Sequence, residues 1–456
     1  LKELVDKKIF DQASTYAYEY LDKLTTSDVY PSEESLMKLQ AFDEELPEAS
    51  GEAADVLRLL HQVGTQGTVT HTGGRYYGFI IGGATPISLA TKWLADVWDQ
   101  CGGLYVSSPL NAELELVCEK WIKDLLNLPE ASVAGFVSGG SMANFSAIIA
   151  ARYHLLHKLG WDVNKKGLNG APKIRIITHH QIHASIRKNL VLLGFGDENI
   201  EYVASDREGR MIVDALPELD STCLIFLQAG NANSGSFDDF DTVCELANKA
   251  NAWVHIDGAF GLWAAASKKL AYLTKGIEKA DSWALDAHKT LNVPYDSGIV
   301  ICKHADAMAN GLQATGEYII YSNDKRDPML YTPEMSKRSR AIELWATLKY
   351  LGKRGIDEMV TNFHESALQL ARALQEAGFL IQNEVVFNQV LVALEDDEST
   401  KAVLLYLQQS GKIWLGGSSW HGKAVIRISV SSWQTNESDL ATTVELFKNA
   451  KRICVT

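Results

Sequence analysis

Strand-like apolar runs alternate with stretches of helical periodicity through the middle of the chain. These runs lie at 173–178, 222–228, 252–256, 282–285 and 298–302. Between two of them, residues 240–250 place apolar side chains at the spacing of an amphipathic helix. This alternation over 130–303 predicts a mostly parallel sheet with helices on both faces.

The first 65 residues are expected to be mostly helical. A helix over 52–63 is expected to bury its apolar side chains, namely Val56, Leu57, Leu59 and Leu60. An arm this apolar needs a surface to cover, and we predict that it packs across a dimer interface. Folding back onto its own domain is the alternative, because periodicity shows a buried face but not its partner.

Three later segments complete the picture of the large domain. A helix over 110–126 is expected to bury Leu114, Leu116, Val117, Trp121 and Leu125. The region 311–333 is interpreted as a long mobile loop, of the kind that closes over active sites. The basic run at 337–340 is short, so we assign it to local salt bridges rather than to nucleic-acid binding.

The pattern beyond residue 341 predicts a smaller α/β domain. Helices are expected at 341–351 and 359–378, and strands near 379–381, 390–394 and 424–429. The chain therefore divides into three parts: an N-terminal helical dimerisation segment (1–85), a large domain (86–345) and a small C-terminal domain (346–456).

Composition narrows the class of protein. The 456 residues are 46% hydrophobic, which allows a large core, and the formal charge of −14 argues against nucleic acid or an anionic membrane as a partner. Six scattered cysteines without a Cys-x-x-Cys pair favour free thiols in a reducing compartment. No apolar run reaches about 18 residues, and the first residues are polar and amphipathic, so we expect a cytoplasmic protein.

An acid and a lysine mark the ends of two of the predicted strands. Asp257 ends the run at 252–256, and Lys289 follows the run at 282–285. Open α/β sheets bind ligands outside the carboxyl ends of their strands. There a carboxylate can keep the ring nitrogen of a pyridine aldehyde protonated, while a lysine forms a Schiff base with the aldehyde. Either residue alone is commonly a cap or a solvated charge, but together they predict pyridoxal 5′-phosphate (PLP) as cofactor.

Other segments are predicted to bind the phosphate, the ring face and a ring oxygen of this cofactor. Gly139, Gly140 and Ser141 lie between a strand and a helix, where backbone amides, a hydroxyl and the helix N-terminus can bind a phosphate. One histidine of His179, His180 and His183 can stack on the ring, although spacing does not choose among them. No acid or cysteine is spaced with these histidines as a metal ligand, so we expect no metal. The polar loop around Asn231 can contact a ring oxygen.

The loop at 71–86 is rich in glycine and aromatic residues. Tyr76, Tyr77, Phe79 and Thr85 can line an apolar substrate pocket, while a connecting loop with packed tyrosines is the alternative. Its glycines do not form a phosphate-binding P-loop pattern. Arg427, inside a predicted strand, can pair with a substrate carboxylate or with a neighbouring acid, and we favour the neighbouring acid.

The chain resembles the group II PLP-dependent amino-acid decarboxylases, which act on aromatic amino acids, tyrosine, histidine or glutamate. The similarity runs from about Tyr76 to Arg340 and is most specific in His255-Ile256-Asp257-Gly258-Ala259 and His288-Lys289. It implies a PLP-dependent transferase fold of the aspartate aminotransferase type (fold type I). It also implies a homodimer with its active site at the interface.

The resemblance implies a role for each matching residue. Lys289 carries the Schiff base, and Asp257 pairs with the ring nitrogen. His183 packs on one face of the ring and Ala259 on the other. His288 lies beside the phosphate, which is bound by Gly139, Gly140 and Ser141. A tyrosine of the mobile loop protonates the product carbon; Tyr331 is our candidate, with Tyr321 and Tyr318 as alternatives. Asp286 stands where the family usually has Asn, and we expect it to face elsewhere or to pair with a base.

These observations predict a decarboxylase that converts an L-amino acid to its amine and carbon dioxide. Aromatic substrates are favoured by Tyr76, Tyr77 and Phe79; glutamate, aspartate and diaminobutyrate are alternatives. An aminotransferase on the same fold, kept open by Arg427, and a non-catalytic PLP-binding protein are the rival functions. A nicotinamide oxidoreductase is disfavoured, because no Gly-x-Gly-x-x-Gly turn follows the first strand.

Overall fold

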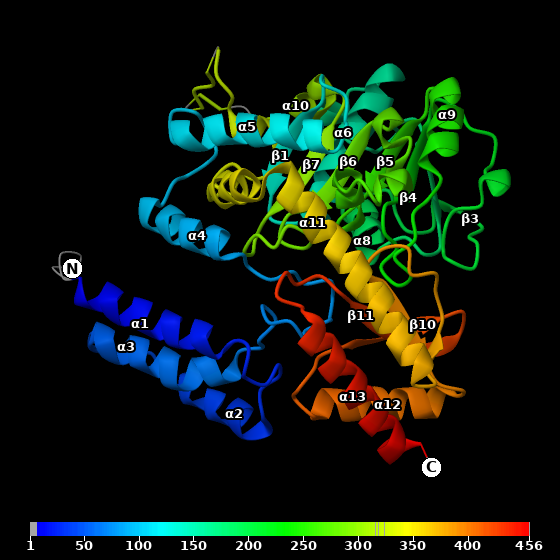
Figure 1. Cartoon of the computed structure of the whole chain (residues 1–456). Coiled ribbons are helices and arrows are strands. Elements are labelled where there is room, and N and C mark those ends of the chain that lie inside the picture. Colours follow the sequence, from blue (N-terminus) through cyan, green and yellow to red (C-terminus); the bar gives the residue numbers. More distant parts are fainter. Residues whose placement is uncertain (1–6, 315, 318, 323, 456) are drawn as a thin grey trace.

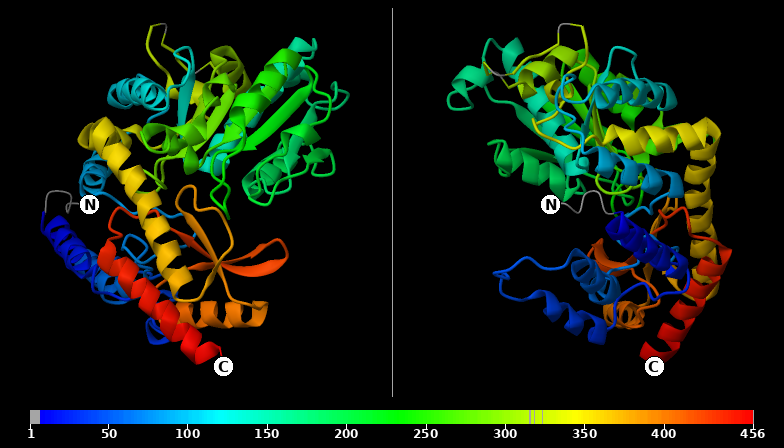
Figure 2. Two further views of the ribbon diagram at one scale, coloured as in Figure 1. Left: turned by 45° about the vertical axis from the view of Figure 1, so that its right-hand side comes forward. Right: turned by 90° about the vertical axis from the view of Figure 1, so that its left-hand side faces the viewer.

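A computed structural model describes residues 7–455 apart from 315, 318 and 323. The chain forms a large domain, a small domain and an N-terminal arm of helices (Figure 1). A long helix, α11 (Ala341–Glu376), runs from the large domain to the small one (Figure 2). The sequence predicted two helices here, and α11 consists of two helical stretches that meet at a kink at Gly352, whose backbone is not helical.

The large domain is built on a seven-stranded sheet with the order β1-β7-β6-β5-β4-β2-β3. The strands are β1 (Val133–Val137), β2 (Arg175–His179), β3 (Ile200–Val203), β4 (Cys223–Gln228), β5 (Trp253–Asp257), β6 (Ser282–Asp286) and β7 (Gly298–Cys302). Neighbours from β3 to β6 are parallel, whereas β7 is antiparallel to both β6 and β1. The expected mostly parallel sheet is confirmed.

Helices cover both faces of this sheet. One face packs against α6 (Gly140–Lys158), α8 (Ala184–Leu192) and α10 (Ala305–Leu312), and the other against α5 (Pro109–Leu125), α9 (Phe240–Ala250) and the start of α11. Because side chains alternate along a strand, β5 sends Trp253, His255 and Asp257 toward α6, while Val254 and Ile256 enter the opposite core.

The small domain holds a four-stranded antiparallel sheet with the order β10-β11-β9-β8. Its strands are β8 (Leu380–Ile381), β9 (Gln389–Ala393), β10 (Gly416–Trp420) and β11 (Lys423–Ser429), and its helices are α12 (Asp397–Gln409) and α13 (Glu437–Cys454). Three strands were predicted. Strand β10 was missed because its Gly-Gly-Ser-Ser sequence has no apolar alternation.

The arm comprises α1 (Lys8–Lys23), α2 (Glu33–Lys38) and α3 (Ala53–Leu59), and none of the described residues in these helices is buried. The expected burial of Val56 and Leu60 is therefore wrong for one chain, where they are 55% and 52% exposed. The reason is that α3 packs on α1 and leaves its other side to solvent. Below the large domain, α4 (Pro86–Trp98) lies next to the arm (Figure 1).

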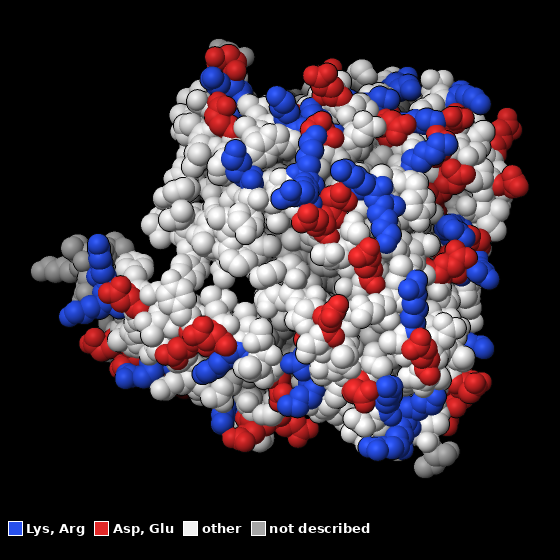
Figure 3. All heavy atoms as spheres, viewed as in Figure 1, with Lys and Arg blue, Asp and Glu red and all other residues white. Residues whose placement is uncertain are grey.

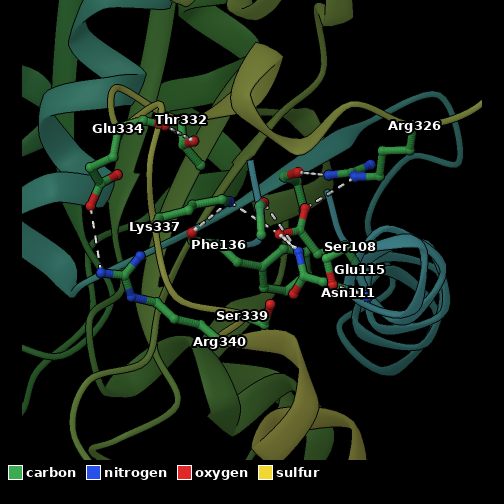
Figure 4. Close-up of polar contacts among 12 residues, drawn as sticks. Ser108, Asn111, Glu115, Phe136, Arg326, Thr332, Glu334, Lys337, Ser339 and Arg340 are labelled. Atoms are coloured by element: carbon green, nitrogen blue, oxygen red, sulfur yellow. Dashed lines mark hydrogen bonds and ion pairs between the residues drawn. The ribbon is translucent and has the colours of Figure 1, made fainter. Parts of the chain in front are cut away.

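The burial predicted for α5 is only partly right, because this helix buries two acids as well as apolar side chains. Leu114, Trp121 and Leu125 are half-buried against the core, as expected. Leu116 is 40% exposed, whereas Glu115 and Glu119 are buried. Arg326 Nη1 lies 2.8 Å from Glu119 Oε2, and Lys337 Nζ lies 3.1 Å from Glu115 Oε1 (Figure 4). These cations come from a segment two hundred residues later, which the local pattern of α5 does not reveal.

The basic run at 337–340 makes the local salt bridges that the sequence predicted. Arg338 Nε and Arg340 Nε lie 2.8 and 3.1 Å from Asp296 Oδ1. The predicted loop at 311–333 overlaps the end of α10 and contains a 3-10 turn, η9 (Pro328–Tyr331). Within the described residues, no helix combines the length and apolar character needed to cross a bilayer.

Candidate active site

Lys289 lies on the turn that follows β6, at the carboxyl edge of the parallel strands. The main-chain N–H groups of Ala287 and His288 both donate to the Ser297 carbonyl, at 3.0 and 3.2 Å, which closes the turn beneath the lysine. Gly82 packs against the main chain of Lys289, and Gly83 N–H donates to Asn292 Oδ1 at 2.8 Å. The loop at 71–86 therefore supports the lysine turn from outside the sheet.

Asp286 ends β6 and pairs with both bases of the turn. Its Oδ2 lies 3.3 Å from Lys289 Nζ and 3.6 Å from His288 Nε2. Its Oδ1 is buried and has no hydrogen-bond partner in the described part of the chain. The expected pairing with a base is present, but the carboxylate also faces the glycine turn: a Cβ atom added to Gly140 would lie 3.0 Å from Asp286 Oδ2.

Gly139 and Gly140 start α6 beside this carboxylate. Among the described residues, no side chain caps the start of this 19-residue helix, so the N–H groups of its first turn are free to bind an anion. A Cβ atom on Gly298 of β7 would overlap the Gly139 main chain, so glycine at 298 allows the turn and the strand to touch. This turn is where the sequence predicted the phosphate to bind, and that role stays a prediction.

Asp257 ends β5 next to this turn, and its carboxylate is buried. Asp257 Oδ2 accepts a hydrogen bond from Asn144 Nδ2 at 3.0 Å, and Oδ1 accepts one from Ala259 N–H at 3.2 Å. Ala259 also lies beside Gly140. Both carboxylate oxygens therefore have a donor on the protein side, which fixes the orientation of the group.

His183 caps the N-terminus of α8 and lies close enough to Asp257 and Lys289 for their charges to act on its pKa. Its Nδ1 lies 2.8 Å from Ser185 Oγ and accepts from Ser185 N–H. Burial lowers the pKa of His183, opposed by the negative charge of Asp257 and reinforced by the positive charge of Lys289. A neutral ring with an accepting Nδ1 carries its proton on Nε2.

The other two histidines lie elsewhere. His179 is buried beside Asp238, with Nε2 3.3 Å from Oδ2, and His180 stacks on Tyr202 with ring centroids 4.1 Å apart. Among the described residues, no three His, Cys, Asp or Glu side chains are grouped as metal ligands.

Tyr295 was not predicted, yet it covers His288. The two rings stack with centroids 4.2 Å apart, and Ser297 N–H donates to His288 Nδ1 at 3.1 Å. Burial lowers the pKa of His288, opposed by Asp286, so the neutral ring keeps its proton on Nε2, toward Asp286. The loop at 71–86 adds Tyr76, whose pKa burial raises to about 12. The sequence signal for Tyr295 was only its place in a turn after the lysine.

The other residues of the loop that were predicted to line a substrate pocket lie in different places. Phe79 is 60% exposed and has a left-handed backbone conformation (φ 53°). Thr85 is buried, and its main-chain N–H donates a hydrogen bond to the Asn292 carbonyl at 3.0 Å. Tyr77 is fully buried in the small-domain core, where its hydroxyl lies 3.1 Å from Thr443 Oγ1. The expectation that Tyr77 lines the entrance is therefore wrong.

Asn231 and the loop tyrosines make other contacts. The Asn231 carboxamide oxygen accepts from the N–H groups of Asn233 and Ser234, so it shapes its own turn. Tyr331 packs its ring 4.6 Å from the Arg326 guanidinium, and Tyr321 donates to the Ala314 carbonyl at 2.7 Å. The structure does not group these three with Lys289, so their roles stay predictions; Tyr318 lies outside the described residues.

Arg427 departs from the expected ion pair with a neighbouring acid. Its Nη1 donates to the Ala232 carbonyl at 3.0 Å, and its Nε is buried without a partner. Among the described residues, no carboxylate lies within ion-pair distance of it. Its charge nevertheless acts on His183, whose pKa it helps to lower. The guanidinium is therefore held by a main-chain carbonyl rather than by a structural acid.

The side chains assembled here fit PLP. The free amides at the start of α6 suit a phosphate, the Asp257 carboxylate suits a protonated ring nitrogen, and the Lys289 amine suits an aldehyde. Asp286 opposes a phosphate at the same turn, although Lys289 offsets its charge.

Proteins of known function resemble this chain in sequence and in fold. The model of the "Pyridoxal-dependent decarboxylase conserved domain" matches residues 35–394. An aromatic-L-amino-acid decarboxylase of Bacillus atrophaeus is 27% identical over 355 residues, 75% of this chain and 71% of that one. An acidic amino acid decarboxylase of Homo sapiens is 28% identical over 314 residues, 66% of this chain and 58% of that one, so the match spans less than three fifths of that relative.

A solved structure extends the likeness to the whole chain. Oryza sativa TDC with PLP and tryptamine superposes with a TM-score of 0.90 at 18% identity, covering 100% of this chain and 99% of that one. At this identity the superposition establishes the fold. The expected fold, a mostly parallel sheet flanked by helices with a smaller C-terminal domain, is confirmed.

Proposed function

The chain belongs to the pyridoxal-dependent decarboxylases, PLP-dependent carboxy-lyases, and on that premise we propose that it converts an aromatic L-amino acid to its amine and carbon dioxide. The observation that carries the proposal is the set formed by Lys289, Asp257 and His183 beside the uncapped start of α6. Each member offers the chemistry that one part of the cofactor needs.

Each of these residues would bind a different part of the cofactor. The first-turn amides of α6 would hold the phosphate, Asp257 would hold a proton on the ring nitrogen, and Lys289 would hold the aldehyde carbon. Bound PLP supplies an electron sink for the electrons left behind when carbon dioxide departs. The protein must then return one proton to the carbon that lost the carboxylate.

Proton return requires a donor whose hydrogen faces the site. The accepting Nδ1 of His183 leaves its Nε2 proton directed away from Ser185, and Lys289 carries a second candidate proton. We assign the step to one of these two or to a loop tyrosine, for which Tyr331 remains our candidate.

Aromatic residues at the mouth favour an aromatic substrate. Tyr295 lies on His288, His71 is edge-on to both Tyr295 and Tyr76 at 6.4 and 6.1 Å, and Phe79 is exposed nearby in the chain. Such faces suit an apolar ring. The Bacillus atrophaeus relative, an aromatic-L-amino-acid decarboxylase, supports the same class.

Arg427 favours the second candidate, an acidic amino acid or an aminotransferase reaction. A half-buried arginine whose buried Nε has no partner is suited to bind a carboxylate. An acidic substrate would place its side-chain carboxylate there. The human relative, an acidic amino acid decarboxylase, supports this alternative.

We further propose that the enzyme is a cytoplasmic homodimer. The arm and α4 expose apolar side chains, among them Phe10, Tyr18, Leu94 and Val97, and the ring centroids of Tyr18 and Trp93 lie 6.0 Å apart. Figure 3 shows few charged atoms between the arm and the large domain. A second chain would cover this face. All six cysteines are free, which suits a reducing compartment.

The test is carbon dioxide release by the PLP-loaded protein across aromatic, acidic and diamino L-amino acids, with keto acids measured in parallel. We expect release with aromatic members, and none from Lys289→Ala. Arg427→Met should leave aromatic turnover within a few-fold but abolish any acidic turnover. Keto acid without carbon dioxide would replace the proposal with an aminotransferase.

A further inference from the structure

Buried hydrogen bonds lead from Asp257 along β5, away from the cofactor site. Asn144 Nδ2 lies 3.0 Å from Asp257 Oδ2, and Asn144 Oδ1 lies 2.9 Å from His255 Nε2. Ser282 Oγ lies 2.9 Å from His255 Nδ1 and 3.0 Å from Trp253 Nε1. All five side chains belong to residues that are at most 4% exposed. Water therefore does not compete for these bonds.

The direction of each bond follows from the chemistry of its ends. An ionised carboxylate only accepts, so the Asn144 amide turns its nitrogen to Asp257 and its oxygen to His255. His255 must then carry its proton on Nε2, which leaves Nδ1 to accept from the Ser282 hydroxyl. Trp253 Nε1–H only donates, and Ser282 accepts it. Every donor in this line of hydrogen bonds, which runs Trp253, Ser282, His255, Asn144, Asp257, therefore points toward Asp257.

The state of His255 agrees with this direction. Burial lowers the pKa of His255 to about 4, so the ring is neutral near neutral pH and has a single ring proton. The register of the sheet places His255 of β5 opposite Ser282 of β6. The alternation of β5 puts Trp253, His255 and Asp257 on one face.

A branch from the same amide reaches the second cofactor residue. Asn144 Nδ2 also lies 3.2 Å from Ser185 Oγ, and Ser185 Oγ lies 2.8 Å from His183 Nδ1. When Ser185 accepts from Asn144, its hydroxyl proton is free to point at His183. That donation leaves the proton of His183 on Nε2. One carboxamide therefore orients both the acid and the histidine.

We propose that Asn144 and His255 are positioning residues that stabilise the negative charge of Asp257, and that Asn144, through the Ser185 hydroxyl, adds a second donor to Nδ1 of His183 beside the Ser185 N–H. The inference rests on the proposed function, since it gives Asp257 a ring nitrogen to hold. Bonds that polarise one another in the same direction strengthen the last bond, and a charged acceptor strengthens it further. Neither Asn144 nor His255 needs to touch the substrate.

The first test compares His255→Leu with His255→Gln in the holoenzyme. Leu removes the donor to Asn144, whereas the Gln amide can supply an N–H in its place. We expect the dissociation constant for PLP alone to rise about tenfold in the Leu variant and less than threefold in the Gln variant. The absorption spectrum of bound PLP, followed against pH, should shift in the Leu variant alone.

The second test protects against a His255 variant that fails to fold. Ser282→Ala removes the hydroxyl that donates to His255 and accepts from Trp253 Nε1, and it leaves His255 itself in place. Ser146→Ala is its matched control, because this buried hydroxyl lies on α6 near Asn144 but donates to the Met142 carbonyl at 2.8 Å, outside the line. We expect the spectrum against pH to change in Ser282→Ala and to stay that of wild type in Ser146→Ala.

Two results would overturn the inference. One is a His255→Leu protein whose PLP affinity and spectrum match wild type; the other is equal changes in Ser282→Ala and Ser146→Ala. Failure of wild type to bind PLP would refute the proposed function instead. Because PLP binding needs no amino acid, the test does not depend on the substrate.

Discussion

Replacing Gly82 with Ala tests whether the loop at 71–86 sets the position of Lys289, the lysine proposed to react with the cofactor. A Cβ atom at residue 82 would overlap the carbonyl oxygen of Lys289 and lie 2.8 Å from the carbonyl oxygen of His288. Both obstacles are main-chain atoms of a closed turn, so no side-chain rotation relieves the overlap. Either the lysine turn or the loop must move.

The required displacement sets the expected size of the effect. Restoring an ordinary contact moves the turn by about 1 Å, and a misplacement of that size costs about 100-fold in turnover. We therefore expect kcat to fall about 100-fold, with a loss of about 1–3 kcal/mol in the free energy of unfolding. Turnover is measured as carbon dioxide release, and stability by urea unfolding.

Gly83→Ala is the matched control in the same loop. Its nearest neighbours are side-chain atoms, Asn292 Oδ1 at 3.1 Å and Ser432 Oγ at 3.2 Å, which can give way by a few tenths of an ångström. We expect its kcat to stay within a few-fold of wild type. Wild-type turnover in Gly82→Ala, or equal losses in both variants, would refute the argument that the loop positions Lys289.

Three further outcomes follow from the structure. Lys337→Met leaves Glu115 without one of its buried cations and should cost about 3–5 kcal/mol in urea unfolding, whereas Lys353→Met, from an exposed pair with Asp124, should cost under about 1 kcal/mol. If Tyr331 is the proton donor, Tyr331→Phe should lower kcat at least about 100-fold at unchanged melting temperature; an unchanged kcat would remove it from the mechanism. Burial lowers the pKa of His255 to about 4, while an unfolded histidine titrates near about 6.5. The unfolded chain therefore binds more protons between these values, so the free energy of unfolding should fall as the pH drops from about 6.5 to about 4, and His255→Gln should flatten that slope.

The sheet and the ends of its strands could be predicted from the sequence, because strands buried on both faces are continuous apolar runs. The positions of Asp257 and Lys289 follow from those runs alone. The choice of His183 among the three histidines does not follow from those runs, because it depends on where α8 begins relative to β5. Its neighbours in space are far away in the chain.

Faces that depend on distant partners were predicted only in part. Leu114 and Leu125 of α5 pack against the core as predicted, but Leu116 is exposed. Glu115 and Glu119 are buried because Arg326 and Lys337 pair with them. Tyr77 was likewise predicted to line the entrance but is buried, because its hydroxyl contacts Thr443 in the last helix. Asn144 gives no local signal beyond lying one turn into the helix that follows the glycines. Its partners, Asp257 and His255 of β5 and Ser185 of α8, all lie far from it in the chain.

The alternation of β5 restricts how this strand can change over evolutionary time. One residue inserted or deleted between Trp253 and Asp257 would turn either the tryptophan or the aspartate onto the opposite face, because side chains change sides at every step. The carboxylate would then enter the packed apolar core that holds Val254 and Ile256. Variation in this strand is therefore confined to point substitutions. Length changes must fall in the turns outside it, where spacing can vary without reversing parity.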